Sequence, residues 1–399
     1  MAQAIISRRG GGSGYATITF NGVSALKRTG AAALYQSRYG LAATTVGDYA
    51  LFGGGYDSSI GFLATVDAYD YNLARTYVSS LSQRRDDLSA TTVGNYALFG
   101  GGRTRSGTTD TFYSTVDAYD TSLTRSTPTT LSLARNYLAA TTVGNYALFG
   151  GGYSDGYSSL NVDAYDSNLT RSTLSSLSRS RYDLPATTVG NYALFGGGHS
   201  NSTTYLPTVD AYDTSLTRTT PTALSQARSS SAATTVGNYA LFGGGYGDGY
   251  SSVVDAYNTS LTRSTPTSLS EARAYLSATT VGDYALFGGG NNGPNLSTVD
   301  AYDTNLINSI SESFIAPQRG TRATTVGDYA LFGGGLGPNG SMESATVNAY
   351  YVNNKVLVYP GTIYKLGSMS TESTSSTMQE IETTAPITGY IKIKDATIN

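Results

Sequence analysis

The segment Thr44-Thr45-Val46-Gly47-Asp48-Tyr49-Ala50-Leu51-Phe52-Gly53-Gly54-Gly55 decides the fold, because it recurs with little change seven times along a chain of 399 residues. In one-letter code the repeated string is TTVG, then Asn or Asp, then YALFGGG. Its first glycine falls at Gly47, Gly94, Gly144, Gly190, Gly237, Gly282 and Gly327. Copies spaced 45 to 50 residues apart indicate one repeat architecture, not a series of unrelated domains.

Each repeat carries strand signals and no helix signal. In the first copy, residues 43–46, 49–52 and 66–69 read ATTV, YALF and VDAY, which are short β-type runs bounded by turn residues. The Gly-Asn or Gly-Asp pair after the first run suits a tight hairpin turn that needs positive φ. A fourth run lies in segments such as SLTRSTPTTLS. One repeat therefore predicts a four-stranded antiparallel meander, whose strands we call a to d.

A single meander cannot bury both of its faces, whereas sheets packed around a ring cover one another and leave no long free edges. We therefore predict an all-β, seven-bladed β-propeller with a small β-rich C-terminal extension. The triple glycine that ends strand b fits this packing, because residues without a Cβ let neighbouring sheets approach closely. A phosphate-binding loop would need a helix after these glycines, and the sequence indicates none.

The repeat resembles the kelch motif over residues 23–350. The matching features are the glycine cluster after strand b, the tyrosine of VDAYD on strand c, and the arginine that precedes the next copy. The tyrosines are Tyr69, Tyr119, Tyr165, Tyr212, Tyr257 and Tyr302. The chain departs from the motif in having no tryptophan. The resemblance implies four-stranded propeller blades.

The repeats divide the chain into three predicted parts. Residues 1–22 are an N-terminal attachment segment, residues 23–351 form the propeller, and residues 352–399 form the C-terminal extension. The seventh copy lacks an obvious strand d. Because Leu26 and Arg28 match Leu216 and Arg218, we expect residues 23–30 to supply that strand. The alternative is that residues 355–359 supply it from the C-terminal side.

The loops between strands b and c differ from blade to blade, while the strands are almost copied. They span residues 56–65, 103–115, 153–161, 199–208, 246–253, 291–298 and 336–346. In a meander these loops share one rim with the d–a connections, so we expect a single variable face. Tyrosines among Ser, Gly and Asn resemble the composition of antibody binding loops. We expect binding by Tyr56, Arg103, Arg105, Tyr113, Tyr153, Tyr157, His199, Tyr205, Tyr246, Tyr250, Asn291 and Asn292; drift of tolerant loop residues is the competing interpretation.

Several kinds of chemistry are disfavoured. The chain has no cysteine and a single histidine, His199, so we expect no metal site, no cofactor and no catalytic centre. The aspartates of strand c recur in nearly identical surroundings, which favours structural pairing over a catalytic acid–base pair. The arginines before each copy are expected to bond backbone carbonyls between blades. A formal net charge of −3 and 13% charged residues predict no nucleic-acid partner, and no run is apolar enough for membrane insertion.

Two functions fit these features, and neither is enzymatic. In the first, the protein belongs to a phage or phage-like particle and binds a host-cell surface glycan or protein, with the termini attached to other tail or baseplate proteins. The start MAQAIISRRGG is similar to the starts of such proteins from phages of Gram-positive hosts, and it lacks the apolar run of a signal peptide. We then expect cytoplasmic synthesis, a location on the particle surface, and avidity from several copies or a homo-oligomer. The alternative is an intracellular bacterial kelch scaffold that binds a protein partner.

Overall fold

The computed structural model describes residues 4–7, 15–20, 25–201, 204–338, 340, 342–353, 355–358, 361–364, 373–375, 379–382 and 390–394. The chain divides into two compact units. One comprises Arg28–Tyr351, and the other combines Met1–Lys27 with Val352–Asn399. Among the described residues there is no helix long and apolar enough to cross a membrane.

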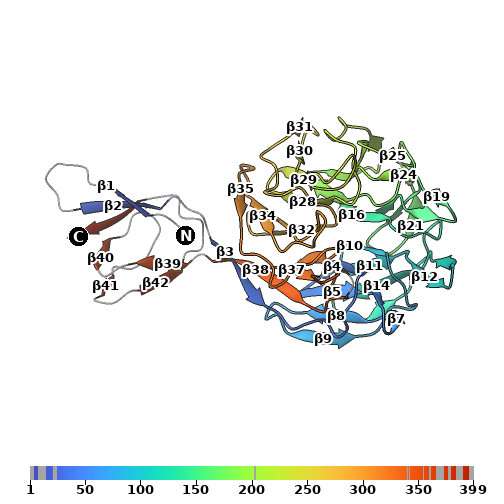
Figure 1. The fold of residues 1–399 in the computed structure, drawn as a ribbon, viewed down its shortest axis with the longest axis horizontal. Helices are drawn as coiled ribbons and strands as arrows, with labels where there is room; N and C mark the ends of the chain where they lie inside the picture. The colour runs from blue at the N-terminus through green and yellow to red at the C-terminus, as the bar shows by residue number, and fades with distance from the viewer. Residues whose placement is uncertain are drawn as a thin grey trace. The chain divides into compact units, whose positions relative to one another are not determined.

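The larger unit is an all-β, seven-bladed propeller, which confirms the fold predicted from the repeats (Figure 1). Each blade is an antiparallel sheet of four strands, ordered from the central channel outward. The blades are β4(Ala42–Val46)-β5(Tyr49–Gly53)-β8(Val66–Tyr69)-β9(Arg75–Val78); β10(Ser89–Val93)-β11(Tyr96–Gly100)-β14(Val116–Asp120)-β15(Arg125–Ser126); β16(Ala139–Val143)-β17(Tyr146–Gly150)-β20(Val162–Tyr165)-β21(Arg171–Thr173); β22(Ala186–Val189)-β23(Tyr192–Gly196)-β26(Val209–Asp213)-β27(Arg218–Thr219); β28(Ala232–Val236)-β29(Tyr239–Gly243)-β30(Val254–Asn258)-β31(Arg263–Ser264); β32(Ser277–Val281)-β33(Tyr284–Gly288)-β34(Val299–Tyr302)-β35(Asn308–Ile310); and β36(Arg322–Val326)-β37(Tyr329–Gly333)-β38(Val347–Asn353)-β3(Ala25–Gly30).

The seventh blade takes its outer strand from the N-terminal side of the chain. Strand β3 lies beside β38 in the sheet, which is the first of the two arrangements considered from the sequence. Residues 355–358 form β39, which pairs instead with β42(Gln379–Glu382). Leu26 of β3 is buried, and the Arg28 backbone N–H donates to Glu312 in the connection between the sixth and seventh blades. The first and last parts of the propeller sequence thus share one blade.

The smaller unit joins the two ends of the chain in a common sheet. Its five strands run in the order β1(Ala4–Ser7), β2(Tyr15–Phe20), β43(Tyr390–Lys394), β40(Gly361–Tyr364) and β41(Ser373–Ser375). Strand β2 pairs with β43, so the N-terminal segment and the C-terminal extension, treated separately in the sequence, are two parts of one sheet. The propeller sequence is inserted between them.

Packing between blades depends on the glycine that ends strand b. A Cβ on Gly53 would lie 2.8 Å from a ring carbon of Phe99 in the next blade, so any side chain there would force the sheets apart. Phe99 also packs edge-to-face on Tyr119, with ring centroids 5.9 Å apart. Threonine hydroxyls join the innermost strands: Thr44 bonds Thr92 of the second blade at 2.9 Å, and Thr45 bonds Thr324 of the seventh at 2.8 Å. The last contact closes the ring.

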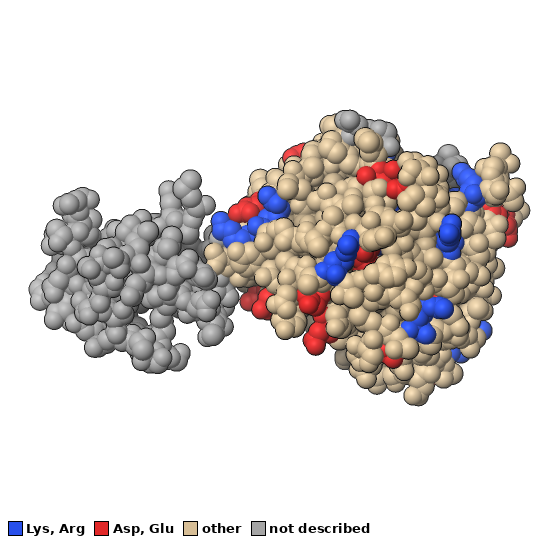
Figure 2. All heavy atoms as spheres, turned by 90° about the horizontal axis from the view of Figure 1, so that it is seen from below, with Lys and Arg blue, Asp and Glu red and all other residues tan. Residues whose placement is uncertain are grey.

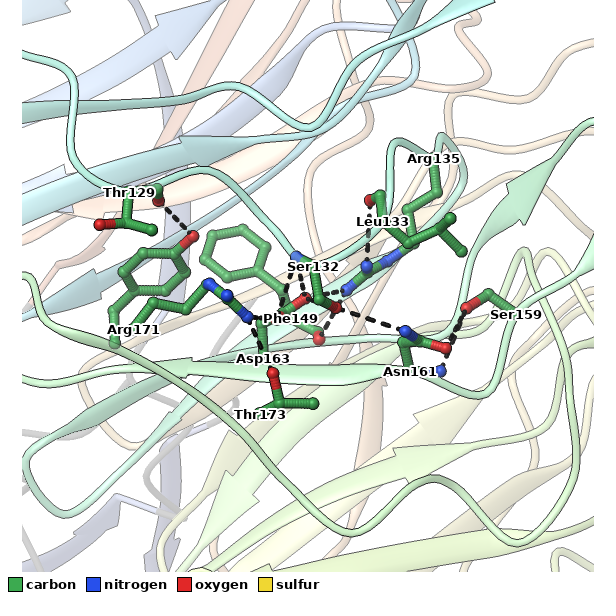
Figure 3. Close-up of polar contacts among 11 residues, drawn as sticks. Thr129, Ser132, Leu133, Arg135, Phe149, Ser159, Asn161, Asp163, Arg171 and Thr173 are labelled. Atoms are coloured by element: carbon green, nitrogen blue, oxygen red, sulfur yellow. Dashed lines mark hydrogen bonds and ion pairs between the residues drawn. The ribbon is translucent and has the colours of Figure 1, made fainter.

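A buried ion pair fixes the inside of six blades, and Figure 3 shows the pair of the third blade. In the third blade, Arg135 donates to Asp163 at 2.9 Å and to the Phe149 carbonyl at 3.2 Å, and the Asp163 carboxylate also accepts from Arg171 at 2.8 Å. The equivalent pairs are Arg38–Asp67, Arg85–Asp117, Arg181–Asp210, Arg228–Asp255 and Arg273–Asp300. The repeated aspartates and arginines therefore form buried pairs, as the structural interpretation of the sequence predicted. The expectation that the arginines bond carbonyls of a neighbouring blade is wrong, because the accepting carbonyl belongs to strand b of the same blade.

The seventh blade replaces the ion pair with a neutral pair. Gln318 stands in the position of the arginine and Asn348 in that of the aspartate, and the Asn348 side-chain amide donates to the Gln318 oxygen at 2.9 Å. Both side chains are buried. Because glutamine replaces arginine and asparagine replaces aspartate in the same blade, neither position holds a buried charge without a partner of opposite charge.

The paired exchange can be transplanted to the sixth blade, where Arg273 and Asp300 lie 2.6 Å apart. Arg273→Gln or Asp300→Asn alone should each lower stability by about 3–5 kcal/mol, because each strands a buried charge. The double variant should recover most of that loss, as measured by thermal unfolding. The pair Arg105–Asp110 serves as the control: its arginine is exposed, so breaking the pair should change stability far less than breaking the buried pair. If the double variant lost as much stability as the two single variants together, the loss could not be attributed to an unpaired buried charge.

Closure by β3 makes a second prediction. Deleting residues 1–30 should lower the melting temperature by more than 10 °C, on the order of 3 kcal/mol or more for a domain of this size, because β38 loses the strand on its outer side and keeps only β37 as a neighbour. Deleting residues 354–399 is the matched control: it also disrupts the terminal sheet but leaves β3 in place. Equal melting temperatures for the two truncated proteins would argue against a stabilising role for β3.

Candidate binding face

The b–c loops lie on the same face as the connections that lead into each innermost strand. In every blade the residue after the triple glycine bridges to the residue after the buried Arg or Gln; in the first blade the Tyr56 N–H donates to the Tyr39 carbonyl at 2.8 Å. The bridged pairs are Tyr39–Tyr56, Asp86–Arg103, Asn136–Tyr153, Tyr182–His199, Ser229–Tyr246, Ala274–Asn291 and Arg319–Leu336. We call the b–c loops together with residues 39–40, 86–87, 136–137, 182–183, 229–230, 274–275 and 319–320 the loop face.

Seven equivalent residues of the loop face encircle the central channel. They are Gly40, Asp87, Tyr137, Asp183, Ser230, Tyr275 and Gly320, and we call them the mouth ring. Each blade is tied to the preceding one here: the Asp87 N–H donates to the Gly40 carbonyl at 2.7 Å, and the Tyr137 N–H donates to the Asp87 carbonyl at 3.0 Å. The same bond recurs as far as Gly320, which donates to Tyr275.

The mouth ring has a strained backbone. All seven residues have φ between 50° and 65°, in the left-handed region that only glycine adopts freely. Glycine occupies just two of the seven positions, and the others carry Asp, Tyr or Ser. An L-residue in this conformation costs about 1–2 kcal/mol. Strain of this kind clusters at functional sites, which makes the side chains of the ring candidates for ligand contact.

The mouth ring opens on a cavity of about 710 Å³, to which every blade contributes. This volume lies in the usual range for small-ligand sites, roughly 300–1,000 Å³. Four titratable side chains line it: the carboxyl groups of Asp87 and Asp183, and the guanidinium groups of Arg319 and Arg322. Farther along the channel, alanines and threonines of the innermost strands surround a second hollow of about 370 Å³.

The two carboxyl groups of the mouth have different partners. Arg103 lies 3.2 Å from Asp87 and 3.5 Å from Asp86, and its guanidinium also approaches the Tyr137 hydroxyl at 3.3 Å. Asp183 accepts a hydrogen bond from the Ser230 hydroxyl. Burial raises the pKa of Asp87 and of Asp183, and burial together with the neighbouring Asp87 raises the pKa of Asp86 to about 8. The mouth therefore holds carboxyl groups that are poorly solvated.

Aromatic rings form a continuous band across four blades of the loop face. Successive members have centroids 4.0–6.1 Å apart, from Phe112 in the second blade to Tyr250 in the fifth. The members of this aromatic arc are Phe112, Tyr153, Tyr182, His199, Tyr205, Tyr246 and Tyr250. His199 stacks against Tyr205 and packs on Tyr182; burial lowers its pKa, and neither of its ring nitrogens has a hydrogen-bond partner in the described part of the chain.

The structure brings together five of the residues expected to bind a ligand: Tyr153, His199, Tyr205, Tyr246 and Tyr250 all belong to the arc. Short hairpins carry most of them, namely β18(Tyr153–Ser154) with β19(Tyr157–Ser158) and β24(His199–Asn201) with β25(Thr204–Tyr205). Tyr157 projects from the tip of its hairpin and is 78% exposed.

The other expected residues lie elsewhere on the same face. Tyr56 in β6(Tyr56–Asp57) packs on Phe62 of β7(Gly61–Phe62), away from the arc. The hairpin of β12(Arg103–Ser106) and β13(Thr109–Phe112) carries Arg103 and Arg105, which both pair with Asp110. The Tyr113 hydroxyl bonds Thr104. Asn291 is buried, and the Asn292 N–H bonds the Pro294 carbonyl within a turn.

Sequence reasoning missed the residues that line the mouth itself, including Asp87, Asp183 and Arg322. A signal was present: the two residues that follow the repeated Arg read YG, DD, NY, YD, SS and AY, and the two after Gln318 read RG. This pair is as variable as the b–c loops, although it sits inside an otherwise copied stretch. Among the described residues, no group of three His, Asp or Glu side chains is arranged to hold a metal ion.

Comparisons with known proteins leave the propeller architecture as the guide to function. No protein-family model matches the chain, and no curated protein matches it.

Replacing Tyr275 by glycine tests whether the mouth ring is strained. Tyr275 is 49% exposed with φ of 56°, so Tyr275→Gly relieves backbone strain while losing little packing, and the melting temperature should stay constant or rise. The control is Tyr77→Gly, at a 57% exposed position within β9, where glycine should cost about 0.5–1 kcal/mol. Equal losses for both variants in thermal unfolding would show that the ring stores no strain.

Proposed function

We propose that the protein is a non-enzymatic, kelch-type binding module of a phage or phage-like particle, and that its loop face recognises a component of the host-cell surface. One observation carries the proposal: the parts that differ among nearly copied blades converge on one face and surround one cavity. A β-propeller is a rigid scaffold that presents loops for binding. Variation confined to a single face is what recognition of one ligand requires.

The make-up of the face supports binding. Tyrosines offer large, rigid contact surfaces at low entropic cost, and the Ser, Gly and Asn residues around them offer adaptable hydrogen bonds. Tyr157 is 78% exposed, so most of its ring is available to contact a ligand. The repeated aspartates are occupied by buried arginines and backbone groups, which supports a structural role for them and a function other than catalysis.

Surface charge fits a partner other than nucleic acid. On the side of the propeller seen in Figure 2, basic and acidic side chains are scattered singly over an otherwise uncharged surface. Electrostatic capture of a polyanion relies on clustered positive charge. The terminal sheet, which combines both ends of the chain, is suited to attach the protein to other tail or baseplate proteins.

Mass spectrometry of purified particles tests the particle assignment. We expect the protein to be a component of tail-bearing particles released from lysed cells. Abundance in uninfected cells together with absence from particles would favour the intracellular kelch scaffold instead.

Recognition by the loop face is tested by replacing Tyr153, Tyr157, Tyr246 and Tyr250 together by serine. Attachment of particles to host cells should fall at least tenfold, because each lost aromatic contact removes on the order of 1 kcal/mol. The control replaces Tyr71 and Tyr77, which are also exposed but lie outside the loop face, and should leave attachment unchanged. Unchanged attachment of the variant with all four substitutions would show that the loop face does not bind the host cell.

A further inference from the structure

We propose that the mouth of the loop face binds the end of an uncharged saccharide chain, and that Arg322, Asp87 and Asp183 hold its hydroxyl groups. The inference rests on the proposed function in taking the loop face as the ligand site. It adds the chemical class of the ligand and the residues that select it.

Arg322 is the feature that first points to this site. It opens the innermost strand of the seventh blade, where the other blades carry only small residues or proline: Ala42, Ser89, Ala139, Pro185, Ala232 and Ser277. The innermost strands are nearly identical in the seven blades, and the seventh differs by carrying a long cationic side chain at the channel mouth. Its Nη1 donates to the Thr321 carbonyl at 3.1 Å, and it forms no ion pair with any described residue.

The positive charge of Arg322 acts on two carboxyl groups from different blades. Burial raises the pKa of both Asp87 and Asp183, and the charge of Arg322 partly offsets that effect at each of them. All three side chains line the same cavity, and Arg322 forms no ion pair with either carboxyl group. The three charged groups, from the second, fourth and seventh blades, enclose a shared space that a small polar ligand can occupy.

The balance of charge selects the kind of ligand. The cavity is lined by two carboxyl groups and two guanidinium groups, because Arg319 accompanies Arg322. An anionic group would meet Asp87 and Asp183, and a cationic group would meet the arginines. Hydroxyl groups donate and accept hydrogen bonds, so they satisfy both kinds of partner without adding charge. Ser230, another residue of the mouth ring, lines the same cavity; its hydroxyl donates to Asp183 and can still accept a hydrogen bond.

The rim supplies the apolar surface that a sugar ring also needs. Tyr182 and His199, whose ring centroids are 4.0 Å apart, line the cavity and belong to the aromatic arc. A pyranose has a face made of C–H groups that packs against such rings, while its hydroxyls point outward. A cavity of about 710 Å³ takes the end of a saccharide chain, and the remaining sugar units would run outward over the arc.

Two variants test the proposal in the full-length protein, and each copies a residue that another blade already carries. Arg322→Ala reproduces Ala42, and Asp183→Ser reproduces Ser230 at an equivalent left-handed position. The probes are a panel of neutral oligosaccharides with different terminal hexoses and N-acetylhexosamines, alongside matched chains that carry uronate or phosphate. The wild type should bind at least one neutral chain and none of its charged counterparts. Each variant should weaken that binding by about tenfold or more, with little change in melting temperature.

Arg105→Ala is the matched control, because Arg105 is 52% exposed on the β12–β13 hairpin and does not line the cavity. It should bind the neutral chain as the wild type does. The proposal is overturned if no neutral chain binds at millimolar concentration, if neutral binding survives both mouth variants, or if charged chains bind better. Particle attachment that depends on the tyrosines but not on Arg322 or Asp183 would also overturn it, and would leave the proposed function standing with a protein receptor. Neutral-chain binding lost in both variants, by a protein absent from particles, would support the saccharide site and refute the particle role.

Discussion

The buried aspartate on the third strand of six blades is the group on which the rest of the propeller depends. In the third blade, Asp163 accepts from two arginines and from the backbone and hydroxyl of Ser132. A buried carboxylate tolerates the interior only when its acceptor positions are filled by donors. Filling them fixes the incoming connection against strands b, c and d at once. This anchoring also sets the positions of the two residues that follow Arg135. Asn136 pairs with Tyr153 of the b–c loop, and Tyr137 belongs to the mouth ring. The framework and the candidate site are therefore consequences of the same interaction.

The sequence was informative wherever a pattern was repeated. The seven copies predicted the blades, and the match of Leu26 and Arg28 to Leu216 and Arg218 pointed to the strand that became β3. The variable loops were also recognisable, and five of their residues meet in the aromatic arc. Local patterns of this kind suffice because each blade is built from contacts within one repeat and with its neighbours.

What the sequence did not indicate arises from contacts between repeats or between distant segments. The left-handed backbone of Tyr137 and Tyr275 is held by the hydrogen bonds that join successive blades around the channel, and tyrosine does not favour this conformation. The placement of Arg322 in one cavity with Asp87 and Asp183 depends on the closed ring, which brings residues of the seventh, second and fourth blades to the same channel mouth. The pairing of β2 with β43 joins residues almost a whole chain apart, and neither segment has a repeat to compare with.

The completion of the seventh blade by β3 also has a consequence for synthesis on the ribosome. Strand β3 ends at Gly30, and its neighbour β38 begins at Val347. At a typical translation rate of about 5–20 residues per second, the earlier strand emerges roughly 15–60 s before the later one. During that interval the nascent chain carries an unpaired edge segment, while the blades made in between pack on one another. The propeller can close only when synthesis is nearly finished. A chain released from a ribosome that stalls within the last repeat would therefore be an open arc of blades instead of a closed ring.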